Sequence, residues 1–371
     1  MSPASHAPTV TSTLAAGFDN VREVFFDLFL TGEEIGASVS VWRDGRPLVE
    51  LHAGWQDAGR QRPWCADTLA MTYSTGKPFA ALAALKAVEL RHLTLDAPIT
   101  RWWPEFGQHN KSSTTLRHIL SHTAGLPAFS EGVRTADPLD SARLIADLVS
   151  QEPLWAPGQV IAEHALTYGH LIEGALAAGS ADDVRTAVAE FAREFGADFW
   201  FGVPEELLGR VADLEIMDQA WVGEYLQRDL SCRALTIPTG RLDPRHTNTA
   251  ASRRATFPAD GLITNASSLA RFYDDLPRRD GTLAQYLGPQ LHEEFMKPQA
   301  TGFDHFLESS ASWSLGLRVD GGGFGMGGIG GSCAWYDPGL DYSMAYVTRG
   351  LGTFDRADAL ATAVENAIGG L

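Results

Sequence analysis

The segments with strand-like patterns lie at the two ends of the chain, and helical patterns fill the middle. Apolar runs typical of strands occur at 37–42 and 47–51, and again at 312–319, 332–336 and 342–348. Asp44-Gly45 separates the first two runs and is a strong hairpin signal. The middle, roughly 128–235, is mainly helical and amphipathic. Since strands of one sheet must meet, both ends are predicted to form one α/β domain with a helical lobe inserted into it.

Helical patterns also flank the strand segments. Apolar residues recur at helical spacing from Leu14 to Leu30, and a closing helix is predicted from about 356 to 367. An alanine-rich helix is predicted from about 74 to 90. A further helix at 116–121 is followed by Gly125 and Pro127, which stop it.

The composition restricts the classes of partner. The 371 residues carry 29 basic and 46 acidic side chains, a formal net charge of -17, which argues against nucleic acid and anionic membrane surfaces. No run of about 18 apolar residues occurs, so no membrane span is expected. The three cysteines are widely spaced and suggest neither a disulfide framework nor a metal site. The first thirteen residues do not resemble a secretory signal, which predicts a cytoplasmic protein.

A serine and a lysine three residues apart open the predicted helix at 74–90. Ser74 and Lys77 would face the same side, about one turn apart. The helix N-terminus favours negative charge at the serine, and a lysine within reach can take its proton. The alternative is structural: Ser74 caps the helix and Lys77 lies at the surface. The pair alone does not decide between these readings.

Several ordered motifs extend the pattern, and with them the chain resembles a known family. They are Leu69–Lys77, Leu95–Ile99, Trp103–Phe106, Leu116–Pro127, Gly202–Glu206 and Ala259–Gly261. In this order the chain resembles the Ser-Lys acyl enzymes of the class C β-lactamase superfamily, especially its esterase-like branch, the family VIII carboxylesterases. The resemblance implies the β-lactamase/penicillin-binding (transpeptidase-like) fold, an antiparallel sheet flanked by terminal helices with an inserted helical lobe.

The resemblance also implies a division of the chain. Residues 14–72 and 255–371 would form a discontinuous sheet domain, and 73–254 a mainly helical lobe. The active site would lie in the cleft between them. His118 and His122, in the motif that ends at Pro127, are expected to be structural.

The second family element normally holds a catalytic tyrosine, and this sequence departs from it. Counting from Trp155-Ala156-Pro157-Gly158, the tyrosine position is Glu163, and Tyr168 follows five residues later. Either Glu163 takes the place of the tyrosine, or a local rearrangement brings Tyr168 into the site, or the third member of the site is lost. A carboxylate beside Lys77 would favour the ammonium form, so that Glu163 becomes the base and Lys77 orients it.

The third element is glycine-rich, at 326–332. By analogy with the family, the backbone N–H groups of Ser74 and Ile329 form an oxyanion hole. Met326 replaces a polar residue that would engage a substrate carboxylate. The resemblance places five residues in contact with substrate: Tyr73, Tyr168, Met326, Gly327 and Gly328. The same stretch contains the spacing Gly-x-Gly-x-x-Gly at 323–328, but a strand is expected after it rather than the helix of a dinucleotide site.

Together these residues predict acyl transfer through an acyl-Ser74 intermediate, with Ser74, Lys77 and Glu163 as the catalytic residues. Water as acceptor gives an esterase or amidase, and an alcohol or amine gives an acyltransferase. The partners are then a small-molecule acyl donor and one of these acceptors, and no metal or organic cofactor is implied. The rival from another class is a non-catalytic relative that binds a small acyl compound.

Overall fold

The computed structural model describes residues 13–180 and 182–370, and within them the two ends of the chain meet in one sheet. All pairings in this nine-stranded sheet are antiparallel. In sheet order the strands are β1 (Thr13–Leu14), β3 (Arg46–Gly54), β2 (Gly36–Arg43), β13 (Tyr342–Thr348), β12 (Cys333–Asp337), β11 (Gly323–Gly327), β10 (Arg318–Asp320), β9 (Ser309–Trp313) and β8 (Ala300–Asp304). The pairing of β2 with β13 joins the two ends, as predicted from the sequence.

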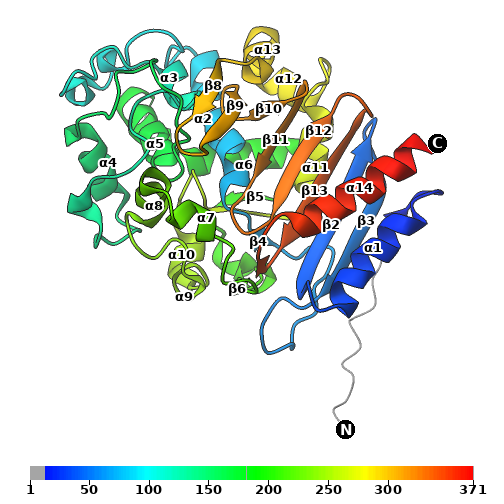
Figure 1. Cartoon of the computed structure of the whole chain (residues 1–371). Coiled ribbons are helices and arrows are strands. Elements are labelled where there is room, and N and C mark those ends of the chain that lie inside the picture. The colour runs from blue at the N-terminus through cyan, green and yellow to red at the C-terminus, as the bar shows by residue number, and fades with distance from the viewer. Residues whose placement is uncertain (1–12, 181, 371) are drawn as a thin grey trace.

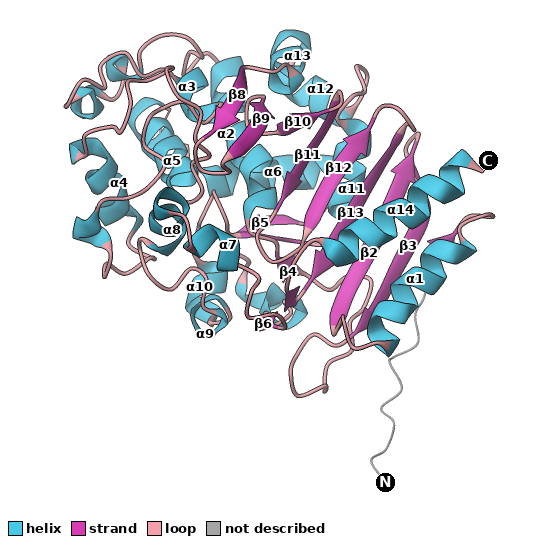
Figure 2. Ribbon diagram, in the orientation of Figure 1, coloured by secondary structure: helices cyan, strands magenta, loops and turns pink. Residues whose placement is uncertain are grey.

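Helices cover both faces of the sheet. The terminal helices α1 (Asp19–Leu30) and α14 (Asp355–Gly369) lie side by side over one face (Figures 1 and 2). Their buried apolar side chains pack with those of β2, β3 and β13 into one core, which includes Phe25, Val39, Tyr346 and Leu360. Helix α11 (Ala266–Asp275) packs on β2, β12 and β13 from the opposite side. The predicted antiparallel sheet with flanking terminal helices is therefore confirmed.

The rest of the chain is mainly helical and lies beside the β8 edge of the sheet (Figure 1). Its central helix, α2 (Lys77–Glu89), packs against α5 (Thr167–Gly179), α6 (Val184–Phe195) and α12 (Thr282–Leu287). Ten of its thirteen residues are buried, and most of these are alanine and leucine. The other helices are α3 (Leu116–Leu120), α4 (Ser141–Ser150), α5 (Thr167–Gly179), α6 (Val184–Phe195), α7 (Gly223–Leu226), α8 (Asp229–Thr236), α9 (Pro244–Thr247), α10 (Ala250–Arg254), α12 (Thr282–Leu287) and α13 (Pro289–Met296).

Two small sheets accompany the helices. One contains β4 (Ala70–Met71), β7 (Leu262–Thr264) and β5 (Phe199–Phe201), and the other pairs β14 (Gly350–Leu351) with β6 (Glu215–Ile216). The first holds the segment that enters α2, so it fixes the N-terminal end of that helix. Two of these short strands, β5 and β6, fall within 73–254, the part of the chain predicted to be the mainly helical lobe. The domain boundaries themselves stay a prediction.

The prediction of one continuous strand over 312–319 is wrong, because the structure has two strands there. β9 ends at Trp313 and β10 begins at Arg318, with a turn between them. In this turn Gly316 has φ 104°, and a Cβ there would lie 2.7 Å from the Cβ of Ala81 and 2.8 Å from the hydroxyl of Tyr168. The chain therefore bends where it passes over α2, and only glycine fits that position.

Glu173, on α5, gives the fold a pH dependence. Burial raises the pKa of Glu173 to about 7 from its usual 4.5, although the Ser141 hydroxyl donates a hydrogen bond to the carboxyl at 2.8 Å. Because the pKa is higher in the folded than in the unfolded chain, the stability that Glu173 contributes is full below pH 4.5 and is lost as the pH rises through about 7. We expect Glu173→Gln to stabilise the protein at pH 8, by on the order of 2 kcal/mol, and not at pH 4. Urea unfolding at both values measures this, and an equal gain at pH 4 would contradict the assignment.

Among the described residues, no helix is both long and apolar enough to cross a membrane.

Candidate active site

Ser74 lies at a strained turn that leads into α2. It begins a short 3-10 helix, Ser74–Gly76, which continues directly into α2 at Lys77. The residue before it, Tyr73, has φ 51° and ψ -128°, a conformation that a non-glycine residue adopts only when its surroundings impose it. Here β7 imposes it, since both the N–H and the hydroxyl of Thr72 donate to the carbonyl of Leu262, at 2.9 and 3.1 Å. Ser74 itself remains partly exposed.

Lys77 and Glu163 extend from Ser74 as a chain of polar contacts. The Lys77 Nζ donates a hydrogen bond to the Ser74 Oγ at 2.6 Å and lies 2.9 Å from Glu163 Oε1. The Lys77 side chain is 0% exposed and that of Glu163 is 9% exposed. Lys77 is therefore not the surface lysine of the structural alternative. A hydroxyl, an amine and a carboxylate in this order allow a proton to move from the first to the last.

A buried carboxylate that the sequence did not single out holds the backbone of Glu163. Asp304, the last residue of β8, is fully buried. Its Oδ1 accepts the N–H of Glu163 at 3.1 Å, and those of Phe306 and Leu307. Its Oδ2 accepts the indole N–H of Trp313 at 2.8 Å. Asp304 thus joins the segment that carries Glu163 to the edge of the main sheet.

Two buried histidines also support this segment. The Nδ1 of His122 accepts the backbone N–H of His164 at 3.1 Å, and the His164 ring lies 2.8 Å from the Ala162 carbonyl. Burial lowers the pKa of His164 to about 4 and that of His122 well below its usual value, so both rings are neutral at neutral pH. His118 closes a capping box with Thr115 at the start of α3. These contacts agree with the structural roles expected for His118 and His122.

We expect Asp304→Asn to impair the reaction through Glu163. The amide removes the negative charge and turns an N–H donor toward N–H groups, so the 161–163 segment should loosen. kcat/KM for an activated ester should fall about 10-fold or more, with a changed pH profile. Ser310→Ala, an exposed change on the adjacent β9, is the matched control. An unaltered pH profile in Asp304→Asn would show that Asp304 only stabilises the fold.

The structure does not bring the two predicted tyrosines to the Ser74–Lys77–Glu163 group. Tyr168 is fully buried on α5, and its hydroxyl donates to the Leu120 carbonyl at 3.4 Å. Tyr73 is 2% exposed, and its hydroxyl donates to the Arg241 carbonyl at 3.5 Å. Both side chains therefore belong to the packing behind the site. For the substrate contacts predicted for them, Tyr168 offers no exposed surface and Tyr73 only 2%.

The glycine-rich element forms β11 and the loop after it, against the nucleophile turn. A Cβ on Gly328 would lie 1.9 Å from the Thr72 carbonyl oxygen, so only glycine allows this approach. Ile329, in the same loop, is partly buried and packs against the apolar residues around Tyr73. Met326 is 5% exposed and packs on Ala311 and Trp313, so its thioether lies mostly within the protein. Gly327 lies between these positions, at the end of β11.

Tyr225 is a further residue of this region that the sequence did not indicate. It lies on α7, with its ring stacked on Phe306 at 5.8 Å between centroids. Burial raises the pKa of Tyr225, and the charge of Glu163 raises it further. No motif surrounds Tyr225, and only the fold places it near Glu163.

Among the described residues there is no group of three or more His, Cys, Asp or Glu side chains that could hold a metal ion.

Comparison with known proteins adds the family to this geometry. The family model described as Beta-lactamase matches residues 22–367. The chain belongs to the β-lactamase family. A crystal structure of a family VIII carboxylesterase superposes with a TM-score of 0.84 at 27% identity, covering 97% of this chain and 100% of that one. The predicted family and fold are thereby confirmed.

The curated relatives of this chain include two proteins named as esterases. This chain is 32% identical over 178 residues to the esterase/beta-lactamase LipL of Mycobacterium tuberculosis, a match that covers 47% of this chain and 40% of LipL. It is 38% identical over 131 residues to the esterase EstB of Burkholderia gladioli, covering 34% of this chain and 33% of EstB. The matches thus span less than half the length of each relative.

Proposed function

We propose that this protein is a serine acyl enzyme that acts as an esterase on a small acyl substrate, through a covalent acyl-Ser74 intermediate. The observation that carries the proposal is the unbroken contact chain from Ser74 Oγ through Lys77 Nζ to Glu163 Oε1. The names of the relatives, two of them esterases and one a carboxylesterase, support this reaction class.

The proton path follows from the same contacts. As Ser74 Oγ attacks the substrate carbonyl carbon, its proton passes to Lys77 Nζ, and Lys77 passes a proton to Glu163. Lys77 thereby stays an ammonium, and Glu163 is the net base. When the tetrahedral intermediate collapses, a proton returns along the chain to the leaving oxygen, and the acyl group remains on Ser74.

The developing oxyanion requires donors on the opposite side of the carbonyl. The backbone N–H groups of Ser74 and Ile329 are our candidates, because Gly328 brings the loop after β11 to within contact of Thr72. Ser74 also lies at the N-terminal end of a helix, where the backbone dipole favours negative charge.

The second half-reaction needs an acceptor that loses a proton. Glu163, once deprotonated, can take that proton through Lys77 from water, an alcohol or an amine. Hydrolysis is our first assignment, and transfer to an alcohol or amine is the alternative that the same relay supports.

Turnover of p-nitrophenyl acetate with analysis of the acyl product tests the proposal. We expect catalytic release of p-nitrophenol and acetate, with a burst when deacylation is slower than acylation. Added hydroxylamine or 1-butanol should give the hydroxamate or butyl ester if transfer competes with hydrolysis. Absence of turnover and of a burst with several activated esters would contradict the enzyme assignment and favour a non-catalytic binder.

A further inference from the structure

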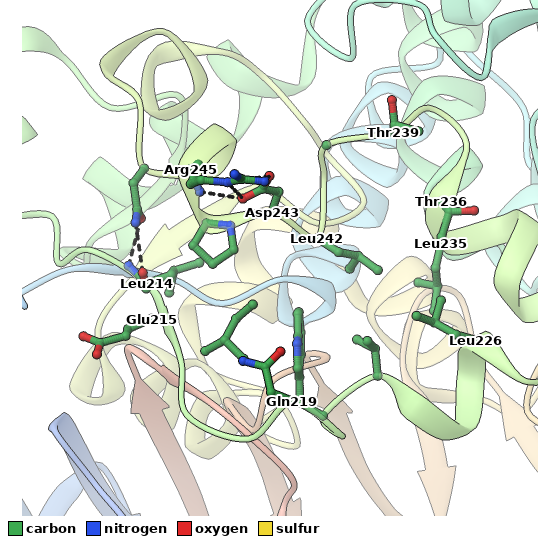
Figure 3. Close-up of a pocket in the computed structure, with 16 residues that line it drawn as sticks. Leu214, Glu215, Gln219, Leu226, Leu235, Thr236, Thr239, Leu242, Asp243 and Arg245 are labelled. Carbon is green, nitrogen blue, oxygen red and sulfur yellow. Dashed lines mark hydrogen bonds and ion pairs between the residues drawn. The ribbon is translucent and has the colours of Figure 1, made fainter.

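A cavity of about 830 Å³ lies next to the candidate active site, outside the Ser74–Lys77–Glu163 group. It is open to solvent on one side and is lined by residues of β6, α7, α8, α9 and the segments that join them. Figure 3 shows Glu215 at one end of the cavity and Leu226 and Leu235 at the other. Its volume lies within the range of small-molecule sites, roughly 300–1,000 Å³.

The walls of this cavity are largely apolar. Trp221, Val222 and Leu235 line it and are buried to more than nine-tenths. Leu242 lines it from the segment before α9. Leu226 lines it from α7 and is 39% exposed, which leaves an apolar side chain in contact with water. A ligand that covered Leu226 would gain the hydrophobic free energy of that surface.

The polar side chains of the lining are mostly engaged within the protein. The pairs are Asn248 with the backbone of Leu214, Thr236 with Cys232, Thr239 with Arg134, Asp243 with Arg245, and Glu215 with Arg349. Gln219 is the remaining polar side chain of the described lining, and it is exposed. Since each charged side chain in the described lining has an ion-pair partner, the cavity favours an uncharged ligand.

Residues that line the cavity pack against residues on both sides of the active site. The Trp221 ring lies 6.0 Å from that of Tyr73, which immediately precedes Ser74, and 3.4 Å from where a Cβ on Gly330 would lie. Leu235 and Leu242 belong to an apolar cluster that also contains Ile329 and Ala165. Ala165 lies two residues beyond Glu163. Apolar side chains of the cavity wall therefore pack against the residue before the nucleophile and against the segment of the base.

We propose that this cavity binds an uncharged, apolar chain or ring of the substrate, so that the enzyme acts on esters with a long apolar group. The proposal rests on the proposed function, because the bound group belongs to the ester that acylates Ser74. The apolar group can belong to the acyl side or to the alcohol side of that ester, and two substrate series distinguish these sources.

The kinetic test compares long and short esters in both series. For the acyl side, p-nitrophenyl hexanoate is compared with p-nitrophenyl acetate, and for the alcohol side, hexyl acetate with ethyl acetate. Wild type should favour the long member of one series in kcat/KM. Leu226→Trp, which fills the cavity, should lower the long-to-short ratio of that series at least about 10-fold. Leu90→Trp, at an apolar residue that is 48% exposed at the far end of α2, should leave both ratios unchanged.

A binding measurement separates this proposal from the proposed function. In the Ser74→Ala background, calorimetry with hexyl acetate and p-nitrophenyl hexanoate should give a Kd that Leu226→Trp weakens at least about 10-fold. Thr236→Phe, which fills the cavity from α8, should act in the same direction if Leu226→Trp does not fold. Unchanged ratios in both series and an unchanged Kd would overturn the proposal. Weakened binding without any turnover by wild type would uphold the cavity and overturn the proposed esterase.

Discussion

Ser74→Ala should abolish ester turnover while the protein remains folded. The alanine lacks the oxygen that would carry the acyl group, and the remaining Lys77 and Glu163 have no nucleophile to activate. Removal of the nucleophile from enzymes that act in this way costs about 10⁴-fold or more in kcat. The measurement is steady-state release of p-nitrophenol from p-nitrophenyl acetate by wild type and variant.

The control for this loss is a serine outside the site. Ser113→Ala, at an exposed position before α3, should keep wild-type turnover. Thermal unfolding of Ser74→Ala should follow that of wild type, because Ser74 is only partly buried and contributes one hydrogen bond from Lys77. Near-wild-type turnover by a folded Ser74→Ala protein would remove Ser74 from the mechanism.

Glu163→Gln should slow acylation of Ser74 by about 100-fold or more. The amide keeps the size of the side chain and an acceptor for Lys77, but it cannot take a proton from Lys77 Nζ, 2.9 Å away. Stopped-flow measurement of the p-nitrophenol burst isolates acylation from deacylation. A change in the pH profile of the burst rate should accompany the loss, because the net base has been removed.

Two comparisons make this result specific. Glu131→Gln, at a side chain that is 61% exposed and paired with Arg134, tests the general effect of losing one carboxylate and should leave acylation unchanged. Lys77→Ala breaks the contact between Ser74 and Glu163 and should lose at least about 100-fold as well. If Glu163→Gln keeps both the acylation rate and the pH profile, the base role returns to Lys77 alone.

The large features of the fold were accessible from sequence because they rest on periodicity and on the turn residues. The hairpin at Asp44-Gly45 joins β2 and β3, and the predicted terminal helices are α1 and α14. β11 was harder to recognise, because three of its five residues are glycine and carry no strand pattern. The break between β9 and β10 was missed because its cause, the approach of Gly316 to Tyr168 and α2, is a tertiary contact.

The candidate site was predictable only where a motif marked it. Counting from Pro157-Gly158 placed Glu163 in the tyrosine position, and the structure puts its carboxylate beside Lys77. Asp304 and Tyr225 carry no such mark, because they reach Glu163 from distant parts of the chain through packing. Tyr168 lies only five residues after Glu163 in the sequence, so the motif made it a candidate for the site. Its burial on α5 results from the packing of the core around it.

Covalent labelling of Ser74 tests the central claim most directly. A fluorophosphonate ester should react with the wild-type protein at one site, and intact mass should rise by one phosphonyl group. Peptide mapping should place the adduct on Ser74, the reaction should be slower in Glu163→Gln, and Ser74→Ala should remain unlabelled. Labelling at another residue, or equal labelling of wild type and Ser74→Ala, would contradict an acyl-Ser74 enzyme.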